Sequence, residues 1–564
     1  MIKTKIKEKI ADALVKLNIE KIDFNIEEPA NTAFGDYATS LPLKLSKELR
    51  KNPFEIAELI AKKIAPDEFI EKIEAVKPGF VNFWISKPYL VNKLKESEKS
   101  FHEFSRFHFG INKKIIVEFA HPNTHKLFHI GHLRNITTGE AIVRILEAAG
   151  NKIVRANYQG DVGMHIAKCL WRIAKLKKEK GESLFKGLEL PEKIKLLGRA
   201  YSEGNKAFEE DPHAKEEIVE INRKIYDKHP EIFPLWKETR QWSLDYFDAI
   251  YKRVYSHFDR FFFESELPKR GVEIAKEALE KNVLKKSEGA IVFDGKQYGL
   301  DTRVFINSLG LPTYEGKELA LAEAEFKEFG DIDKCIHIVG PEQASFFKVT
   351  FKVEELLNPE KYKDKQRHLI YGWVRLKHGK MSSRSGNVVQ GTWLLDEAKD
   401  KIRNKFKCDP ETAEVLAVAS VKYSFLKTST ANETVFDFDE SVSIEGNSAP
   451  YLIYTYVRAR SVLNKEILSV MTDNIKLNAD EHTLLRLINK FPETVYHASS
   501  NLSPSVITTY LYDLAQAYNN FYQKNPILKS TPEIKTFRLA LTKSVSEILK
   551  HGLRLLGIET VEHM

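Results

Sequence analysis

Three histidines and two basic residues lie close together in the segment PNTHKLFHIGHLRN, residues 122–135. This segment follows the β-branched run KKIIVEFA and precedes a stretch with helical periodicity, so we expect it to join a strand to a helix. His129 and His132 would then lie in the first helical turn, where free backbone N–H groups and the helix dipole favour phosphate. Gly131 between them would let a ligand approach the backbone. The pattern is typical of a site that stabilises charge on phosphorus during a displacement.

The histidine spacing also allows other interpretations. Counting His121, the four histidines of this region are separated by 4, 4 and 3 residues, a spacing that would line one face of a continuous helix and could bind a metal. Pro122 and the preceding strand oppose such a helix, so we expect no metal ligands here. The two histidines of HIGH could also be surface residues at a helix cap, and this motif alone leaves that alternative open.

A second segment, GKMSSRSGN, lies at residues 379–387, about 250 residues downstream. Its Gly/Ser-rich composition predicts a loop, and Lys380 and Arg384 provide cations on it. Cations on a flexible loop can close over a pyrophosphate leaving group as its charge develops. Alone the segment could be a solvated basic loop, but together with HIGH on the other half of one sheet it indicates a shared nucleotide site.

The order of the expected helices and strands predicts a multidomain α/β protein. Residues 1–105 read as a small α+β domain. Residues 106–410 show the strand–helix–strand pattern of a Rossmann-like parallel sheet, with a Lys/Glu-rich helical insertion at about 170–285. Strand signals return at GAIVFDG, TRVFINS, KCIHIVG and HLIYGWVRL, so the sheet is expected to form from two separated halves. Residues 411–564 are almost wholly helical and predict an all-α domain.

The composition excludes several protein classes. The chain has 564 residues, of which 43% are hydrophobic and 29% charged, and no apolar run reaches the length of a membrane span, roughly 18 to 20 residues. Its start lacks the features of a secretory signal, so we expect a cytoplasmic protein without membrane contact. Three scattered cysteines support neither a disulfide framework nor a zinc site. The net charge of +8 permits a polyanionic partner without requiring one.

The two motifs resemble the signatures of class I aminoacyl-tRNA synthetases, which activate an amino acid with ATP and transfer it to tRNA. Within that class, two segments are similar to the arginyl-tRNA synthetase family, namely VEFAHPNTHKLFHIGHLRNITTGEAIVRILEAAGNKIVRANYQGDVGMH and GWVRLKHGKMSSRSGNVV. The resemblance covers nearly the whole chain. The first hundred residues, with FGDYAT, NPFEIAELIA and VKPGFVNFWIS, are similar to the family's additional N-terminal domain, which contacts the outer corner of the tRNA. The helical tail is similar to its anticodon-binding domain.

The resemblance implies catalytic roles for His129, His132 and Lys380. The residues that it places on ATP are His129, Gly131, His132, Lys380, Met381 and Ser382. Ser383 stands where many class I enzymes have a second lysine, and the resemblance implies that Lys126 replaces that cation. We expect Mg²⁺ to accompany the nucleotide, because the sequence contains no acidic metal-binding cluster.

The resemblance also implies an arginine site. The residues that it assigns to that site are Glu118, His121, Asn123, Tyr314, Glu318 and Gln343. Three positions depart from the family: His121 replaces a small residue, commonly serine; Glu318 replaces Asp; and Phe346 replaces His. Carboxylates suit a guanidinium because they accept forked hydrogen bonds, and an apolar amino acid would leave them unpaired.

The implied function is arginine–tRNA ligation through an arginyl-adenylate, with L-arginine and tRNA(Arg) as partners and a monomeric enzyme. The family resemblance also implies that tRNA binds before activation. One tail helix offers aromatic residues for stacking on anticodon bases and cations for phosphates, namely Tyr451, Tyr454, Tyr456, Arg458 and Arg460. At helical spacing such aromatics could equally be core residues. Three rival functions are another HxGH nucleotidyltransferase, a non-enzymatic tRNA-binding paralogue and a synthetase for another amino acid.

Overall fold

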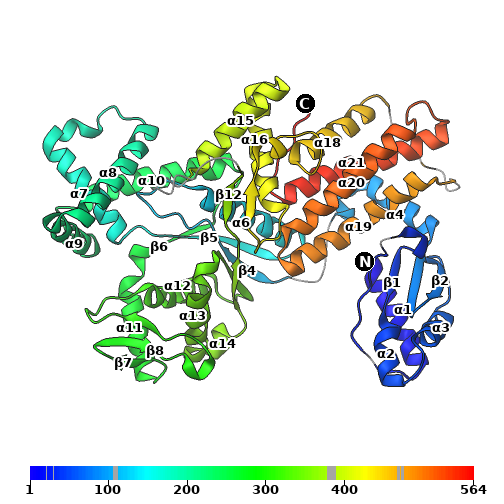
Figure 1. Ribbon diagram of the computed structural model, residues 1–564, viewed down its shortest axis with the longest axis horizontal. Coiled ribbons are helices and arrows are strands. Elements are labelled where there is room, and N and C mark those ends of the chain that lie inside the picture. Colours follow the sequence, from blue (N-terminus) through cyan, green and yellow to red (C-terminus); the bar gives the residue numbers. More distant parts are fainter. Residues whose placement is uncertain (21, 30, 106–111, 378–388, 467–470, 472–475) are drawn as a thin grey trace.

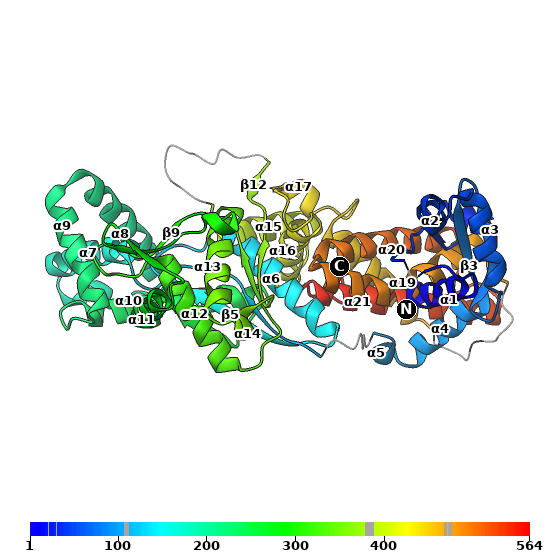
Figure 2. The same cartoon turned by 90° about the horizontal axis from the view of Figure 1, so that it is seen from below.

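The computed structural model describes all of residues 1–564 except 21, 30, 106–111, 378–388, 467–470 and 472–475. Along the long axis of the molecule, a group of helices inserted after the second strand of the central parallel sheet lies at one end and the N-terminal unit at the other (Figure 1). A parallel sheet lies in the middle, and a helical C-terminal unit lies between that sheet and the N-terminal unit (Figure 2). The predicted multidomain α/β architecture is confirmed.

The N-terminal unit is a small antiparallel sheet covered by helices. Its elements are α1 (Ile2–Lys16), β1 (Tyr37–Thr39), α2 (Leu41–Leu49), α3 (Pro53–Lys63), β2 (Ile70–Val76), β3 (Phe80–Ile85), α4 (Lys87–Lys99) and α5 (Phe101–Phe104). The strand order is β1-β3-β2. The last long helix of this unit, α4, buries Leu90 and Leu94 in the same core as the C-terminal helices.

The central sheet has five parallel strands in the order β11-β10-β4-β5-β6. These strands are β4 (Lys114–Glu118), β5 (Lys152–Gln159), β6 (Arg260–Phe263), β10 (Lys334–Val339) and β11 (Gln366–Ile370). The helix α6 (Ile130–Ala148) connects β4 to β5. Apolar side chains alternate along β4, so Ile115 and Val117 join one core and Ile116 joins the core on the opposite face.

The inserted helices follow β5. They are α7 (Met164–Lys180), α8 (Leu190–Glu210), α9 (Pro212–Tyr226) and α10 (Phe233–Arg253). The helical insertion predicted at about 170–285 is wrong in one respect, because β6 lies within that range and forms an edge of the parallel sheet. This strand has only four residues, RFFF, which are too few to show a period in the sequence.

A second, antiparallel sheet follows, in the order β7-β8-β9. The elements of this region are α11 (Pro268–Glu280), β7 (Lys285–Ser287), β8 (Ala290–Phe293), β9 (Arg303–Ile306), α12 (Tyr314–Phe329), α13 (Ala344–Leu357) and α14 (Pro359–Tyr362). GAIVFDG and TRVFINS are strands as predicted, but they belong to this small sheet, so their assignment to the parallel sheet is wrong. The two halves of the parallel sheet are β4 to β6 and β10 to β11.

In its described residues, the C-terminal part is helical apart from one two-stranded pairing. Its elements are β12 (Val374–Leu376), α15 (Gly391–Phe406), α16 (Pro410–Leu426), β13 (Thr434–Phe436), α17 (Phe438–Ser441), α18 (Ala449–Leu463), α19 (Ala479–Asn501), α20 (Pro504–Lys524) and α21 (Pro532–Leu555). The predicted boundary near residue 410 falls between α15 and α16, which pack against each other and against α6. None of the helices in the described ranges is both long and apolar enough to cross a membrane.

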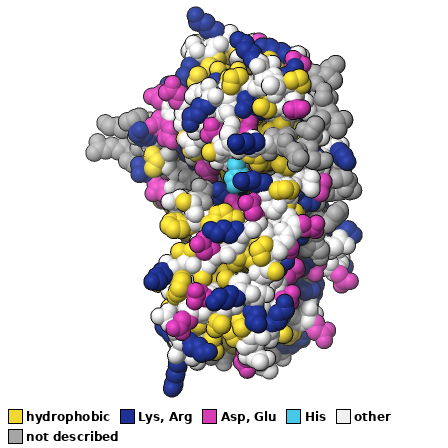
Figure 3. Space-filling model, turned by 90° about the vertical axis from the view of Figure 1, so that its right-hand side faces the viewer, with side chains coloured by type: hydrophobic (Ala, Val, Ile, Leu, Met, Phe, Trp, Pro, Cys, Tyr) yellow, Lys and Arg dark blue, Asp and Glu magenta, His cyan; other side chains and the backbone are white. Residues whose placement is uncertain are grey.

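Ion pairs join the N-terminal unit to α19. Arg486 Nε lies 2.5 Å from Asp36 Oδ1, and Lys490 Nζ lies 2.6 Å from Glu28 Oε2. Figure 3 views this end of the molecule, where Lys and Arg side chains are interspersed with acidic and apolar ones. The N-terminal unit is thus docked on the C-terminal helices.

Candidate active site

His129 and His132 cap the start of α6 and stack on each other. His129 is the N-cap residue, and its Nδ1 accepts hydrogen bonds from the backbone N–H groups of Gly131 and His132, at 3.1 and 3.3 Å. In return, His132 Nδ1 accepts from the backbone N–H of His129 at 3.2 Å. The ring centroids are 3.6 Å apart. The predicted location of both histidines in the first helical turn is confirmed.

These backbone hydrogen bonds determine where the imidazole protons lie. Each Nδ1 accepts an N–H, so in the neutral ring the proton must be on Nε2. Burial and the nearby charge of Lys126 lower the pKa of His129 to about 4. Burial, together with His129, His121 and Lys126, holds the pKa of His132 well below its ordinary value. Both rings are therefore neutral at pH 7, with an N–H donor on the edge away from the helix backbone.

Gly131 has a steric role beside His129. A Cβ at this position would lie 2.9 Å from Cε1 and 3.0 Å from Nδ1 of His129. The absence of a side chain therefore makes room for the His129 ring, and the approach of ATP to this backbone stays a prediction.

The second motif lies outside the described residues, and this includes Lys380, Met381, Ser382, Ser383 and Arg384. The residues that follow it are described and are bonded directly to the HIGH segment. Ile130 N–H donates to the carbonyl of Val389 and Gly391 N–H donates to the carbonyl of Phe128, both at 2.9 Å. The chain leaving the second motif is thus fixed beside the first turn of α6.

A cleft of about 750 Å³ opens at this junction. The residues that line it are Asn123, His125, Lys126, Leu127, His129, His132, Gly198, Tyr201, Ser202, Val389, Gln390 and Trp393. The inserted helix α8 and the first turn of α15 therefore form walls of the same cleft as the histidines. Burial, followed by the charge of Lys168, lowers the pKa of Lys126, and its Nζ lies 5.4 Å from the ring centre of Tyr201.

Glu118 ends β4, and the chain then turns sharply. Ala120 and His121 have positive φ angles of 78° and 49°, which place His121 back beside the carboxylate. His121 Nδ1 lies 3.6 Å from Glu118 Oε1, while Glu118 Oε2 and His121 Nε2 are buried without a hydrogen-bond partner. A buried carboxylate oxygen without a donor is costly, so Glu118 Oε2 is suited to accept a hydrogen bond from a ligand.

Glu318 faces the same region from α12. Its side chain is buried and its Oε1 has no hydrogen-bond partner. Burial raises the pKa of Glu318 to about 8, with a lowering contribution from His337 and a raising one from the nearby Glu118. Glu315, not Glu318, is the acidic residue in the first turn of α12, so a helix-dipole role does not explain Glu318.

The other residues implied for the arginine site are less closely assembled. Tyr314 begins α12 with 70% of its surface exposed. Asn123 is close enough to Gly160 that a Cβ there would lie 2.1 Å from Asn123 Oδ1. Gln343 is exposed, and none of the described hydrogen bonds joins it to Glu118 or Glu318. Phe346 is buried and packs edge-on against Phe347 at 5.0 Å.

Sequence reasoning missed a group of buried polar residues behind Glu118. His337 lies on β10 in register with Glu118, so the two side chains lie on the same face of the sheet. His337 Nδ1 is 3.4 Å from Glu118 Oε1 and its Nε2 is 2.9 Å from Gln366 Oε1. Cys335 and Glu325 lie beside them. The only signal in the sequence was a histidine at an inward-facing position of the apolar strand KCIHIVG.

Glu325, Cys335 and His337 offer potential metal-ligand atoms within 4.8 Å of one another. Both ring nitrogens of His337 already face oxygen atoms, however, as given above. The hydrogen-bonded arrangement accounts for the histidine without a metal ion.

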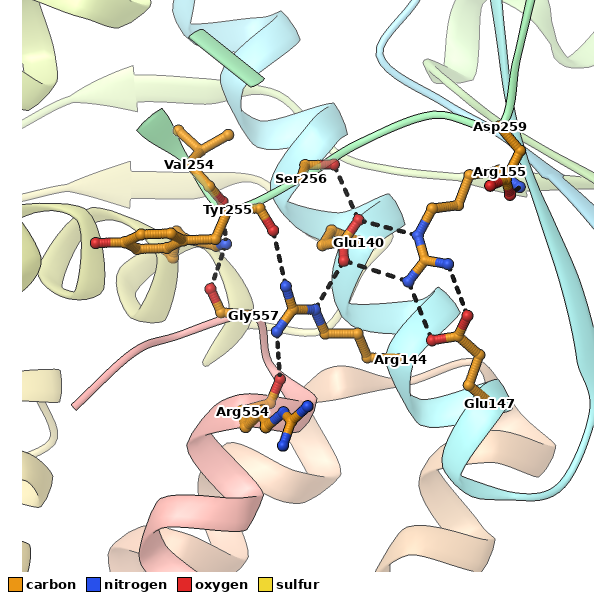
Figure 4. Close-up of polar contacts among 11 residues, drawn as sticks. Glu140, Arg144, Glu147, Arg155, Val254, Tyr255, Ser256, Asp259, Arg554 and Gly557 are labelled. Carbon is orange, nitrogen blue, oxygen red and sulfur yellow. Dashed lines mark hydrogen bonds and ion pairs between the residues drawn. The ribbon is translucent and has the colours of Figure 1, made fainter. Parts of the chain in front are cut away.

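The far end of α6 is held by a buried ion-pair network (Figure 4). Glu140 is fully buried, and Arg144 Nε donates to it at 2.7 Å while Arg155 of β5 pairs with it at 3.5 Å. Arg144 also donates to the backbone carbonyls of Tyr255, at 2.7 Å, and Arg554, at 3.2 Å. The helix that begins with the two histidines is thereby fixed both to the parallel sheet and to the last turn of α21.

Family models match three successive parts of the chain. Residues 2–85 match the arginyl tRNA synthetase N-terminal domain, and residues 100–438 match the catalytic domain of class I tRNA synthetases of the arginine type. Residues 452–564 match the DALR anticodon-binding domain.

Individual proteins give the same result. The chain is 34% identical over 570 residues to an arginine–tRNA ligase of Clostridioides difficile, covering 99% of this chain and 98% of that protein. It is 33% identical over 574 residues to an arginine–tRNA ligase of Halothermothrix orenii, covering 99% of each. Among solved structures, an arginyl-tRNA synthetase of Thermus thermophilus superposes with a TM-score of 0.84 at 25% identity and covers 100% of both chains.

Proposed function

Since the chain belongs to the arginyl-tRNA synthetase family and is an arginine–tRNA ligase, we propose that the start of α6 acts on ATP while Glu118 and Glu318 hold the guanidinium of arginine. The enzyme activates L-arginine with ATP and then transfers the arginyl group to tRNA. The proposal assigns the parts of this reaction to individual side chains.

His129 and His132 donate hydrogen bonds to the phosphates through their Nε2–H groups. The neutral rings support this role, because an imidazole that accepts through Nδ1 keeps a donor on Nε2 at all pH values near neutrality. As the α-phosphorus is attacked by the arginine carboxylate and pyrophosphate departs, negative charge grows on the phosphate oxygens. Donors held rigidly by the helix backbone stabilise that charge without reorganising.

Lys126 and the second motif provide the positive charge. Lys126 lines the cleft beside His129, and burial makes its charge act in a less polar environment than water. Lys380 brings a second cation from the loop, and Met381 and Ser382 extend that contact along the nucleotide. The bonding of Val389 and Gly391 to the HIGH segment supports this arrangement, because it ties the chain that leaves the loop to the cleft.

Mg²⁺ enters with the nucleotide rather than through a protein cage. None of the described residues that line the cleft is a carboxylate, so phosphate oxygens and water are the ligands that remain for a hard cation. When bound, Mg²⁺ neutralises charge on the leaving pyrophosphate.

The arginine assignment depends on two buried carboxyl groups, Glu118 and Glu318, that each have one oxygen without a partner. Glu325 and Glu354 share this feature, and the family resemblance selects Glu118 and Glu318 among the four. A guanidinium has five donors in a planar fork and can satisfy both oxygens. Asn123, His121, Tyr314 and Gln343 complete the proposed site around the rest of the amino acid.

The tRNA contacts are divided between the two ends of the chain. We assign the outer corner of tRNA(Arg) to the N-terminal unit, residues 1–105, and the anticodon to the helices after α16. On α18, Tyr456 is buried and its hydroxyl donates to Glu562, so it is a core residue rather than a stacking surface. Tyr454 is 36% exposed and lies 4.7 Å from Arg458, which makes this pair the candidate for base stacking.

ATP–pyrophosphate exchange with each amino acid in turn, with and without tRNA(Arg), tests the proposal. We expect exchange with L-arginine alone, and only when tRNA is present. Exchange with another amino acid would contradict the carboxylate assignment, whereas arginine exchange without tRNA would remove only the requirement for tRNA. We also propose a monomer that acts in the cytoplasm, which light scattering and cell fractionation check.

A further inference from the structure

The buried polar group behind Glu118 has His337 at its centre. Its ring is fully buried between the parallel sheet and the helices α12 and α13, against the rings of Phe347 and Phe351 at 5.1 and 5.4 Å. The titratable groups that face it are Glu118 on β4, His121 after β4, Cys335 on β10, Glu318 and Glu325 on α12, Glu354 on α13 and His368 on β11. Four buried glutamates therefore surround one histidine.

The hydrogen bonds around His337 determine its protonation. Gln366 Nε2 donates to Glu354 Oε2 at 2.8 Å, which orients the amide so that its oxygen faces His337 Nε2 at 2.9 Å. An amide oxygen only accepts, so His337 Nε2 must carry a proton. His337 Nδ1 faces Glu118 Oε1 at 3.4 Å, and a carboxylate oxygen likewise only accepts. Both ring nitrogens therefore point at acceptors.

We propose that His337 is a positioning residue of the arginine site, a doubly protonated imidazolium that holds one oxygen of Glu118 and leaves the other for the substrate guanidinium. This inference rests on the proposed assignment of Glu118 and Glu318 to arginine. His337 does not touch the substrate; it acts through Glu118, which it keeps ionised and oriented.

The state of the neighbouring groups fits this arrangement. Burial alone would raise the pKa of Glu118, but His337, followed by His121 and a hydrogen bond with Glu325, reverses the effect and the pKa lies below its ordinary value. Burial raises the pKa of Glu318 to about 8 and that of Glu354 to about 8, and it raises those of Glu325 and Cys335 well above their ordinary values. At pH 7 the cluster therefore holds one cation, His337, and one anion, Glu118.

Arginine binding changes the charge of this cluster. The Glu118–His337 pair is neutral overall, so the guanidinium needs a second anion, and Glu318 supplies it by losing its proton. The step balances: the neutral carboxyl of Glu318 releases one proton to solvent and the resulting carboxylate pairs with the cationic guanidinium. Arginine binding near neutral pH should then release about one proton. Below pH 7, the arginine KM should therefore fall about tenfold for each unit by which the pH is raised.

Two substitutions separate this role from simple packing. His337→Phe fits the aromatic surroundings but removes the charge, so Glu118 should also become protonated and two protons must leave when arginine binds. The arginine KM should then change about a hundredfold per pH unit, with the ATP KM unchanged. His337→Asn keeps a donor toward Glu118 without the charge, so it should show the same steep pH dependence of the arginine KM as His337→Phe.

The experiment measures the arginine KM in tRNA-dependent ATP–pyrophosphate exchange between pH 6 and 8 for the wild type and both variants. His213→Asn, at an exposed histidine of α9, is the matched control and should follow the wild type. Titration calorimetry of the wild type with arginine, in two buffers of different ionisation enthalpy, counts the released protons directly and needs no variant to fold.

Two results would overturn the inference: the same slope of the arginine KM against pH for the wild type and His337→Phe, or arginine binding without proton release. Glu118→Gln distinguishes this failure from failure of the arginine site itself. If Glu118→Gln raises the arginine KM about 30-fold or more while the His337 variants keep the wild-type slope, only the inference about His337 is wrong. If Glu118→Gln leaves the arginine KM unchanged, the proposed site is wrong.

Discussion

His129 and His132 each accept, through Nδ1, a backbone N–H of the other residue. This reciprocal capping fixes both rings, leaves both Nε2 protons free and stacks the rings 3.6 Å apart. The first turn of α6 therefore presents two neutral Nε2–H donors, and backbone hydrogen bonds hold both in a fixed orientation.

His132→Ala should lower the turnover of arginine activation by roughly 10²- to 10³-fold, because one donor to the developing phosphate charge is lost. Single-turnover formation of arginyl-adenylate measures the effect, with the thermal midpoint as a check on the helix start, since the cap is also lost. A variant within about twofold of the wild type would remove His132 from the mechanism.

Lys126→Ala should slow adenylate formation and leave tRNA binding nearly intact. Ser383 cannot neutralise phosphate, so the cleft depends on Lys126 and Lys380 for positive charge. Filter binding of tRNA(Arg) beside adenylate kinetics separates the two effects. Lys193→Ala, on the inserted helix α8 but outside the cleft, is the matched control and should behave as the wild type. Equal losses in adenylate formation and tRNA binding for Lys126→Ala would instead indicate a disturbed loop at residues 121–129.

Arg458→Ala should weaken productive tRNA binding by about 5- to 150-fold, which corresponds to about 1 to 3 kcal/mol for loss of one stacking contact. Arg458 lies between the rings of Tyr454 and Tyr522, at 4.7 and 5.3 Å. Point substitution is preferable to truncation near residue 410, because α16 packs against α6 and its removal would expose the core of the catalytic unit. The tRNA KM in aminoacylation is the measurement, and an unchanged value would place the anticodon elsewhere.

The sequence predicted the positions of the strands and helices better than it predicted which strands pair in a sheet. Long β-branched runs located β4, β5 and β10, because a buried parallel strand needs such residues. The same signal located β8 and β9 but could not say which sheet they join, since strand pairing depends on contacts distant in sequence. In the site, the histidines were found because they sit where a strand ends and a helix begins, whereas Glu118 was assigned by the family resemblance. His337 was missed because a single histidine in an apolar strand has the same appearance as a core residue.

Stability should depend on pH through Glu318. Its pKa is raised from an ordinary value of 4.5 to about 8, so the folded state binds its proton more tightly than the unfolded state does. This contribution is fully present below about pH 4.5 and is lost as the pH rises through about 8. Denaturant midpoints between pH 5 and 8 should therefore fall less steeply for Glu318→Gln than for the wild type. Identical slopes would mean that Glu318 is ionised in the free enzyme.

The arginine and ATP dependences of exchange, measured side by side for Glu318→Gln and the wild type, test the central claim most directly. Glutamine matches the shape of the residue but cannot ionise, so the guanidinium loses one buried anionic partner at a cost of about 2 to 5 kcal/mol. The account predicts an arginine KM raised about 30-fold or more with an almost unchanged ATP KM. An unchanged arginine KM, or an equal rise in both KM values, would contradict the assignment of Glu318 to the arginine site.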